Sequence, residues 1–185
     1  MKGCRPLEEK EIQEISEKLT QMGRHGQRNQ LLLLLGCRTG FRISELLSIK
    51  VRDAIQHGKA VTRVTVSRCN MKGKIESRSV VLVNSLKPLI LDYVSVTGLK
   101  ADDLLFNISR IEAHRVLKKA FQILRMDGKL ACHSLRKTFA NNVYEQLDHD
   151  LVKTQAALGH KWISTTAQYI SFAQEDVDAA ILAAG

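Results

Sequence analysis

The sequence lacks the long apolar runs of a membrane-spanning protein. Its densest run, Leu31–Leu35, holds five leucines between polar residues, whereas a transmembrane helix needs roughly 20 apolar residues. The opening residues lead into charged sequence rather than an apolar signal core, so nothing predicts export. Internal repeats, low-complexity segments and linkers are also absent. These absences predict a single domain over residues 1–185 that works in the cytoplasm without a membrane partner.

Metal-binding patterns are missing as well. The four cysteines form no CxxC pair or Cys/His cluster of the kind that builds a zinc site, so we expect free thiols in a reducing compartment. No carboxylates or histidines lie at ligand spacing near the segments singled out below. The sequence therefore predicts a protein that uses neither a metal nor another cofactor.

Acidic residues are outnumbered by basic ones. The chain has 28 lysines and arginines against 19 acids, for a net charge of +9 and a pI near 9.6. This balance favours a polyanionic partner such as DNA or RNA. Charge alone does not decide the matter, because many basic proteins bind no nucleic acid.

Most of the chain shows helical periodicity. Ile12, Ile15, Leu19 and Met22 recur at steps of three and four, which is typical of an amphipathic helix. Further helices are predicted at residues 28–38, 42–47, 85–96, 109–125, 133–145, 151–158, 164–170 and 174–183.

The stretch between residues 49 and 83 differs. β-Branched residues alternate with polar ones in Val61–Val66 and cluster again in Val80–Val83, and a basic, glycine-containing turn at residues 69–74 separates them. We expect a β-hairpin here. The predicted fold class is thus mainly α with one small antiparallel sheet, an α+β arrangement.

Chemically capable side chains gather in four segments. Taken singly, each has an ordinary explanation: Arg42 could sit on a solvated helix face, His133 and His160 could cap helix ends, and Tyr169 could be a core tyrosine. His133 and Arg136, three residues apart at a helix start, could also converge on one anion. The segments are residues 39–46, the hairpin tip around Lys72, residues 133–136, and residues 158–160 with Tyr169 beyond them.

The joint occurrence of these segments resembles the tyrosine recombinase (phage integrase) family. Residues 39–47 are similar to its first-arginine box, and residues 133–140 match its His-x-x-Arg box. Residues 158–169 match the Leu-Gly-His box, which leads nine residues on to the nucleophilic tyrosine. The resemblance runs from about Leu7 to Tyr169, in the family's order and at its approximate spacing. It implies the catalytic-domain fold of that family.

The resemblance implies a role for each matching residue. Tyr169 is expected to be the nucleophile, and Glu45 to support the site without touching the phosphate. His133 is the better candidate for assisting the proton of the tyrosine, and His160 for holding a phosphate oxygen. The residues expected around the scissile phosphate are Arg42, Lys72, His133, Arg136 and His160.

The hairpin departs from the family pattern. The usual tip reads Lys-Gly-x-Lys-x-Arg, whereas residues 72–78 hold one more residue before Arg78. We place the general acid on Lys72, with Lys74 as the runner-up. Lys74, Arg78 and Lys137 are expected to contact DNA, and Lys137 stands where relatives often carry histidine.

Physical chemistry agrees with these roles. A tyrosine phenolate conserves the energy of the phosphodiester in a covalent 3′-phosphotyrosyl intermediate that a DNA 5′-hydroxyl can displace, so no ATP is required. Planar guanidiniums match the charge that the transition state spreads over the nonbridging oxygens. The expected activity is site-specific recombination of double-stranded DNA, of the integrase, excisionase or invertase type.

Other features leave alternatives open. A type IB topoisomerase uses similar tyrosine chemistry, and a non-catalytic DNA-binding regulator could derive from the same family. We expect the amino-terminal DNA-clamping domain of longer relatives to be absent, as in an excised fragment or a short natural invertase. The helix at residues 174–183 docks either on a neighbouring protomer or on its own domain. We expect a monomer in solution that forms a tetramer on DNA.

Overall fold

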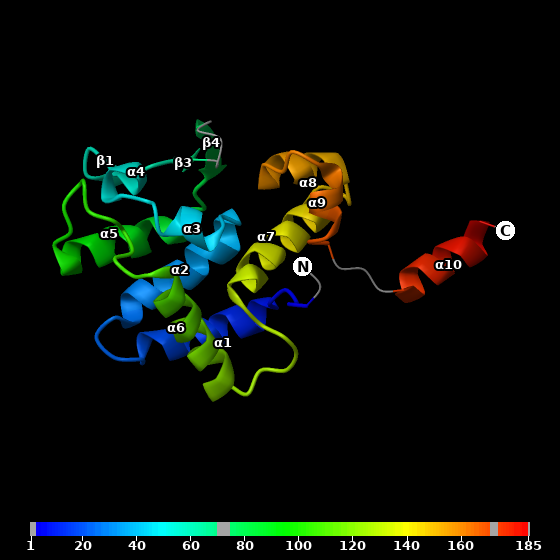
Figure 1. Ribbon diagram of the computed structural model, residues 1–185, viewed down its shortest axis with the longest axis horizontal. Helices are drawn as coiled ribbons and strands as arrows, with labels where there is room; N and C mark the ends of the chain where they lie inside the picture. The colour runs from blue at the N-terminus through cyan, green and yellow to red at the C-terminus, as the bar shows by residue number, and fades with distance from the viewer. Residues whose placement is uncertain (1–2, 70–74, 171–173, 185) are drawn as a thin grey trace.

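The computed structural model describes residues 3–69, 75–170 and 174–184, which form mostly helices (Figure 1). None of the described helices is long and apolar enough to cross a bilayer. The helices in chain order are α1 (Glu9–Thr20), α2 (Gly26–Thr39), α3 (Ile43–Leu46), α4 (Val51–Ala54), α5 (Leu86–Thr97), α6 (Arg110–Ile123), α7 (Cys132–Gln146), α8 (Leu151–Leu158), α9 (Ile163–Ala167) and α10 (Gln174–Ala184).

Helix α2 is the central element of the helical body. Leu32, Leu33 and Leu35 are fully buried, although they point to different sides of the helix. This is possible because α2 packs against α1, α5, α6 and α7 at once. The helix ends at Gly40, whose φ of +58° is left-handed. A Cβ there would lie 2.3 Å from Cδ1 of Phe139, so only glycine lets α7 approach this closely.

The interior divides into three apolar clusters. The largest joins α2 to α3, α4, α5 and the strands, and the second joins α1, α2, α6 and α7. The third is small, with Phe139 and Ala140 of α7 packed on Leu158 of α8 and on the partly buried Tyr169. Helix α7 therefore lies between the main body and the α8–α9 pair (Figure 1).

The structure contains two small sheets where the sequence predicts one. Strand β3 (Arg63–Cys69) pairs antiparallel with β4 (Ile75–Val81) as expected. The predicted second strand at Val80–Val83 is wrong in position, because β4 begins at Ile75. One of the residues that β4 turns inward is Arg78, which a search for apolar alternation passes over. The other sheet, β1 (Ile55–Gln56) with β2 (Lys59–Ala60), was not predicted, since two residues per strand give no periodic signal.

The last two helices differ in how they pack. Helix α9 ends at Ala167, so the predicted helix through residue 170 is too long and Tyr169 lies in the turn that follows. Helix α10 stands apart from the other helices (Figure 1), and its Ile181 and Leu182 are 65% and 82% exposed. The mainly helical fold class with small antiparallel sheets is confirmed.

Candidate active site

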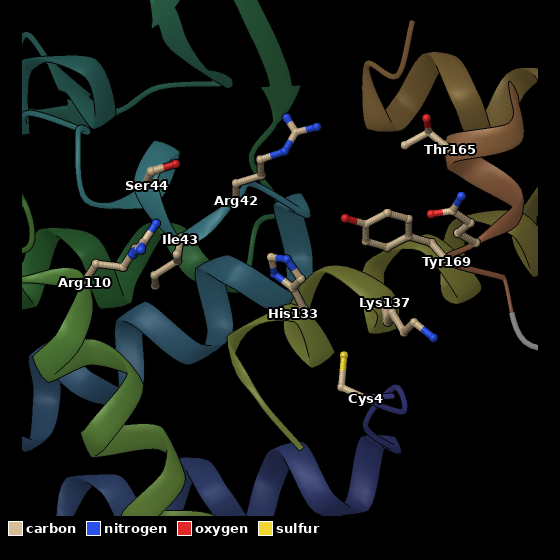
Figure 2. A pocket seen from close by; sticks show the side chains of 10 residues that line it. Cys4, Arg42, Ile43, Ser44, Arg110, His133, Lys137, Thr165 and Tyr169 are labelled. Carbon is tan, nitrogen blue, oxygen red and sulfur yellow. The ribbon is translucent and has the colours of Figure 1, made fainter. Parts of the chain in front are cut away.

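A pocket of about 420 Å³ gathers residues from five parts of the chain (Figure 2). Arg42 comes from the turn after α2, His133 from the first turn of α7, and Tyr169 from the turn after α9. The phenol hydroxyl of Tyr169 points into the pocket, toward the side on which Arg42 and His133 lie (Figure 2). The described residues lining it are Cys4, Arg42, Ile43, Ser44, Arg110, His133, Lys137, Thr165, Gln168 and Tyr169.

Arg42 is held at the pocket by Glu45, which is only 6% exposed. The Glu45 carboxylate accepts from the backbone N–H of Arg42 at 2.7 Å and from its guanidinium at 3.2 Å. The first contact caps the start of α3, and the second fixes the direction of the arginine side chain. The Arg42 side chain is still 37% exposed, so it can meet a ligand in the pocket. This geometry fits the supporting role predicted for Glu45.

Arg136 is among the most deeply buried side chains, with 1% exposed. Its guanidinium donates to the carbonyl oxygen of Gly40 and, at 2.9 Å, to that of Leu158. The same group stands 5.5 Å from the ring centroid of Tyr169, a cation–π distance. Because these contacts come from α2, α8 and the turn after α9, Arg136 ties together the three segments that carry the candidate site.

His160 lies behind the pocket, and contacts to both ring nitrogens set its tautomer. Its Nε2 is 2.8 Å from the Arg136 guanidinium, and its Nδ1 is 2.9 Å from Oγ1 of Thr166. Arginine has only donors, so Nε2 must accept and the Nδ1–H must donate to Thr166. His160 is therefore neutral in this arrangement, with its ring centroid 5.1 Å from that of Tyr169. It reaches the site because Gly159 ends α8 in a left-handed conformation with φ +60°.

Tyr169 is placed by its backbone as well as by its ring. Its N–H donates to the carbonyl of Thr166 at 2.8 Å, and its carbonyl accepts from Nδ2 of Asn141 on α7 at 3.0 Å. The bond from Asn141 attaches the turn after α9 to the same helix that carries His133 and Arg136. The turn is thereby held so that the Tyr169 hydroxyl faces the pocket.

His133 has a pKa below the ordinary value of 6.5. Burial disfavours the charged imidazolium, and the nearby positive charges of Arg136 and Arg42 repel a proton further. The imidazole is therefore neutral at pH 7 and can accept a proton. Arg42 lines the same pocket as His133.

The family of the chain follows from comparison with known proteins. The family model described as the phage integrase family matches residues 5–176, which is nearly the whole chain. The chain belongs to the phage integrase family. The family predicted from the sequence motifs is thus confirmed.

Two curated relatives illustrate the range of this family. The probable integrase/recombinase YoeC of Bacillus subtilis is 30% identical over 176 residues, an alignment that covers 91% of this chain and 90% of the relative. A tyrosine recombinase of Pseudothermotoga lettingae is 30% identical over 169 residues, covering 88% of this chain and 56% of the relative. The chain therefore spans nearly all of the first integrase relative but little more than half of the second.

A solved structure supports the fold. The XerH site-specific recombinase bound to a palindromic difH substrate superposes with a TM-score of 0.73 at 22% identity. The match covers 95% of this chain and 51% of the XerH chain. The integrase-family fold predicted for the chain is therefore confirmed.

The DNA-contacting lysines and arginine predicted from the sequence have different outcomes. Lys137 lines the pocket beside Tyr169 (Figure 2), where a phosphate could reach it. Lys72 and Lys74 lie outside the described residues, so the general acid stays a prediction. Arg78 is not on an accessible face of this integrase-family domain: it is 6% exposed and bound inside the protein. In this arrangement its guanidinium donates to buried carbonyl groups, and direct DNA contact by Arg78 stays a prediction.

Several residues of the site were missed by sequence reasoning. Arg110 begins α6 and lines the pocket from the side opposite Tyr169, an approach that only tertiary packing creates. Thr166 could have been found from the sequence. Gly159 turns the chain after α8, so a hydroxyl six residues after His160 can come back to its ring. Ser44, Thr165 and Gln168 lie within the recognised boxes of the integrase family but carry no signal of their own.

Proposed function

We propose that this chain is a site-specific DNA recombinase that cleaves and rejoins double-stranded DNA through Tyr169. The observation that carries the proposal is the position of the Tyr169 hydroxyl, which faces a pocket containing Arg42 and His133 while its ring rests near buried Arg136. A phenol among cationic groups is suited to attack on a phosphodiester, since the anionic phosphate is drawn to the same place.

Side chains of this chain can accept and supply every proton that the reaction moves. The Tyr169 oxygen attacks the phosphorus, its proton passes to neutral His133, and the bond to the 5′-oxygen breaks. Lys72, or Lys74 in its place, supplies the proton that the leaving 5′-oxygen takes up. The DNA is left as a 3′-phosphotyrosyl ester, from which a 5′-hydroxyl of the partner strand displaces the tyrosine. No other energy source is needed, because the phosphotyrosyl ester conserves the energy of the broken phosphodiester bond.

Charge stabilisation falls to the two arginines. Negative charge on the nonbridging oxygens grows toward the transition state, and fixed guanidiniums act on it without reorganising. Arg42 is held in advance by Glu45, and Arg136 by the carbonyls of Gly40 and Leu158. Preorganised donors of this kind each contribute about 10²- to 10³-fold in rate.

Trapping on nicked DNA tests the proposal. A pool of duplexes with randomised sequence, each nicked in one strand, is incubated with the chain. Cleavage just before a nick releases a short fragment whose 5′-hydroxyl diffuses away, so the break cannot be resealed. We expect an SDS-stable protein–DNA adduct joined to the 3′ side of the break, and sequencing of the trapped strands gives the site. If the pool yields no SDS-stable adduct, the proposed reaction is wrong.

The pH dependence of this step follows from His133. Its lowered pKa keeps the imidazole in the proton-accepting form at pH 6.5, where an ordinary histidine is half protonated. We expect the second-order rate of adduct formation at pH 6.5 to remain above half of its pH 8 value and to fall further at lower pH, as His133 takes up a proton. His133→Gln should be slower and lose this acidic fall. A midpoint above pH 6.5, or a fall kept by the variant, contradicts the assignment.

We further propose that the chain acts as a tetramer on DNA and is monomeric without it. Strand exchange needs two cleaved duplexes, hence two protomers per site and four per synapse. The exposed Ile181 and Leu182 of α10 offer an apolar face for a neighbouring protomer. Light scattering of the chain, alone and with the trapped duplex, tests this: a monomer in both samples is the contrary result. The same function places the chain at the nucleoid, which imaging of a tagged chain checks.

A further inference from the structure

A second buried arginine lies beside the proposed site without lining its pocket. Arg78 projects inward from β4, where its strand partner is Val66, and it is 6% exposed. Arginines are almost never this buried unless they are paired. Its guanidinium lies 4.9 Å from the ring centroid of Phe41 and 6.0 Å from that of Phe139, so two aromatic rings border it.

The hydrogen bonds of Arg78 join the ends of two helices. The guanidinium donates to the carbonyls of Thr39 at 2.9 Å and Gly40 at 3.2 Å, at the end of α2. It also donates to Ala157 at 2.7 Å, in the last turn of α8. The last carbonyls of a helix lack partners within it and carry partial negative charge. A cation is therefore favoured at the carboxyl ends of both α2 and α8. One planar group thus fixes the distance between α2 and α8.

Both helix ends lead directly into the candidate site. Arg42 follows α2 by three residues, and His160 follows α8 by two. Arg78 also approaches the carboxylate of Glu45, the residue that orients Arg42, at 3.9 Å. Its position is therefore coupled to both sides of the pocket.

Arg78 and Arg136 bind the same helix ends. Both donate to the carbonyl oxygen of Gly40, and they bind consecutive carbonyls of α8, Ala157 for Arg78 and Leu158 for Arg136. If Arg78 is removed, the carbonyls of Thr39 and Ala157 lose a donor, and Arg136 is left as the cation next to both helix ends. Its guanidinium is then expected to shift from the geometry that a phosphate needs.

We propose that Arg78 is a positioning residue for DNA cleavage, which sets the Arg136 guanidinium through the shared Gly40 carbonyl and the fixed helix ends. This role rests on the proposed recombinase function. It requires no contact between Arg78 and DNA, in keeping with its burial. The planar fork is essential to it, because an ammonium cannot reach three carbonyls on two helices at once.

A neutral scissile group separates this role from a general loss of structure. The duplex trapped by the wild-type chain is made again with either the ordinary phosphate or a methylphosphonate at the cleaved position. The methylphosphonate has one nonbridging oxygen fewer and no negative charge, so its cleavage depends less on a guanidinium. A variant that merely lowers the folded fraction loses the same factor on both substrates.

We expect Arg78→Met to cleave the phosphodiester about 100-fold more slowly than wild type, a loss of the size seen when one preorganised donor is displaced. On the methylphosphonate the deficit should shrink to less than about 10-fold, as it should for Arg136→Ala. Arg78→Lys, which keeps the charge, should recover only part of the rate. Arg52→Met is the matched control, because Arg52 is an exposed arginine of α4 that pairs with Asp102. Its rates should match wild type.

Binding distinguishes positioning from direct contact with DNA. The logarithm of the affinity of Arg78→Met should fall with the logarithm of salt concentration at the wild-type slope, whereas loss of a phosphate contact reduces that slope by about one. Circular dichroism melting identifies variants that do not fold, and Arg78→Lys then carries the comparison. Equal deficits on both substrates, a wild-type rate for Arg78→Lys or a reduced salt slope each overturn the positioning role. A wild-type chain that traps no DNA overturns the recombinase function itself.

Discussion

Tyr169→Phe is expected to abolish covalent capture of DNA while leaving the fold and DNA binding close to wild type. The substitution removes the attacking oxygen and nothing else. The phenyl ring keeps its place in the small cluster with Phe139 and Leu158 and stays beside His160. The backbone bonds that place this turn, from Tyr169 to Thr166 and from Asn141 to Tyr169, do not involve the hydroxyl.

The expected loss is the largest of any single substitution in the chain. Removal of a nucleophile costs about six orders of magnitude in a hydrolase whose other groups remain, so SDS-stable adducts should fall below detection. Tyr144→Phe provides the matched control: Tyr144 is on α7 and packs edge-on against His149, outside the pocket. It should form adducts at the wild-type rate. Adducts that persist in Tyr169→Phe would mean that another side chain attacks the phosphorus.

The sequence was a good guide wherever a local signal exists. The position of α2 was predictable because its leucines occupy every side of the helix, as a central helix requires. Arg42, His133, Arg136, His160 and Tyr169 were found through motif spacing, and the structure brings all five together. Their convergence could not be derived from periodicity, because it depends on how α7 is placed between α2 and the α8–α9 pair.

The failures share a physical cause. The burial of Arg78 could not be predicted, because an arginine in a strand is normally a surface residue and its partners here are carbonyls that α2 and α8 contribute. Tyr169 was placed on a helix because the composition of residues 164–170 remains compatible with one. Helix α9 ends at Ala167, and in the turn that follows the carbonyl of Tyr169 accepts a hydrogen bond from Asn141 of α7. In both cases a tertiary polar contact outweighs the local preference.

Arg136→Lys is expected to reduce cleavage by about 10²- to 10³-fold, although it keeps the positive charge. The guanidinium donates to Gly40 and Leu158, contacts His160 Nε2, and faces the Tyr169 ring. An ammonium is a point donor without a planar fork, so it cannot hold this arrangement while also meeting two phosphate oxygens. Single-turnover cleavage of the trapped duplex at saturating protein measures the loss. A rate equal to wild type would show that the fork is not the phosphate clamp.

Stability must be measured together with the rate, because the same substitution leaves buried acceptors unpaired. A buried carbonyl that loses its donor costs about 1–3 kcal/mol, so Arg136→Lys should also lower the melting temperature. Arg42→Lys separates the two effects. Arg42 is 37% exposed and its side chain pairs with Glu45, an ion pair that a lysine can keep. Arg42→Lys should therefore melt close to wild type yet still cleave far more slowly, since the phosphate needs guanidinium donors from both sides of the pocket.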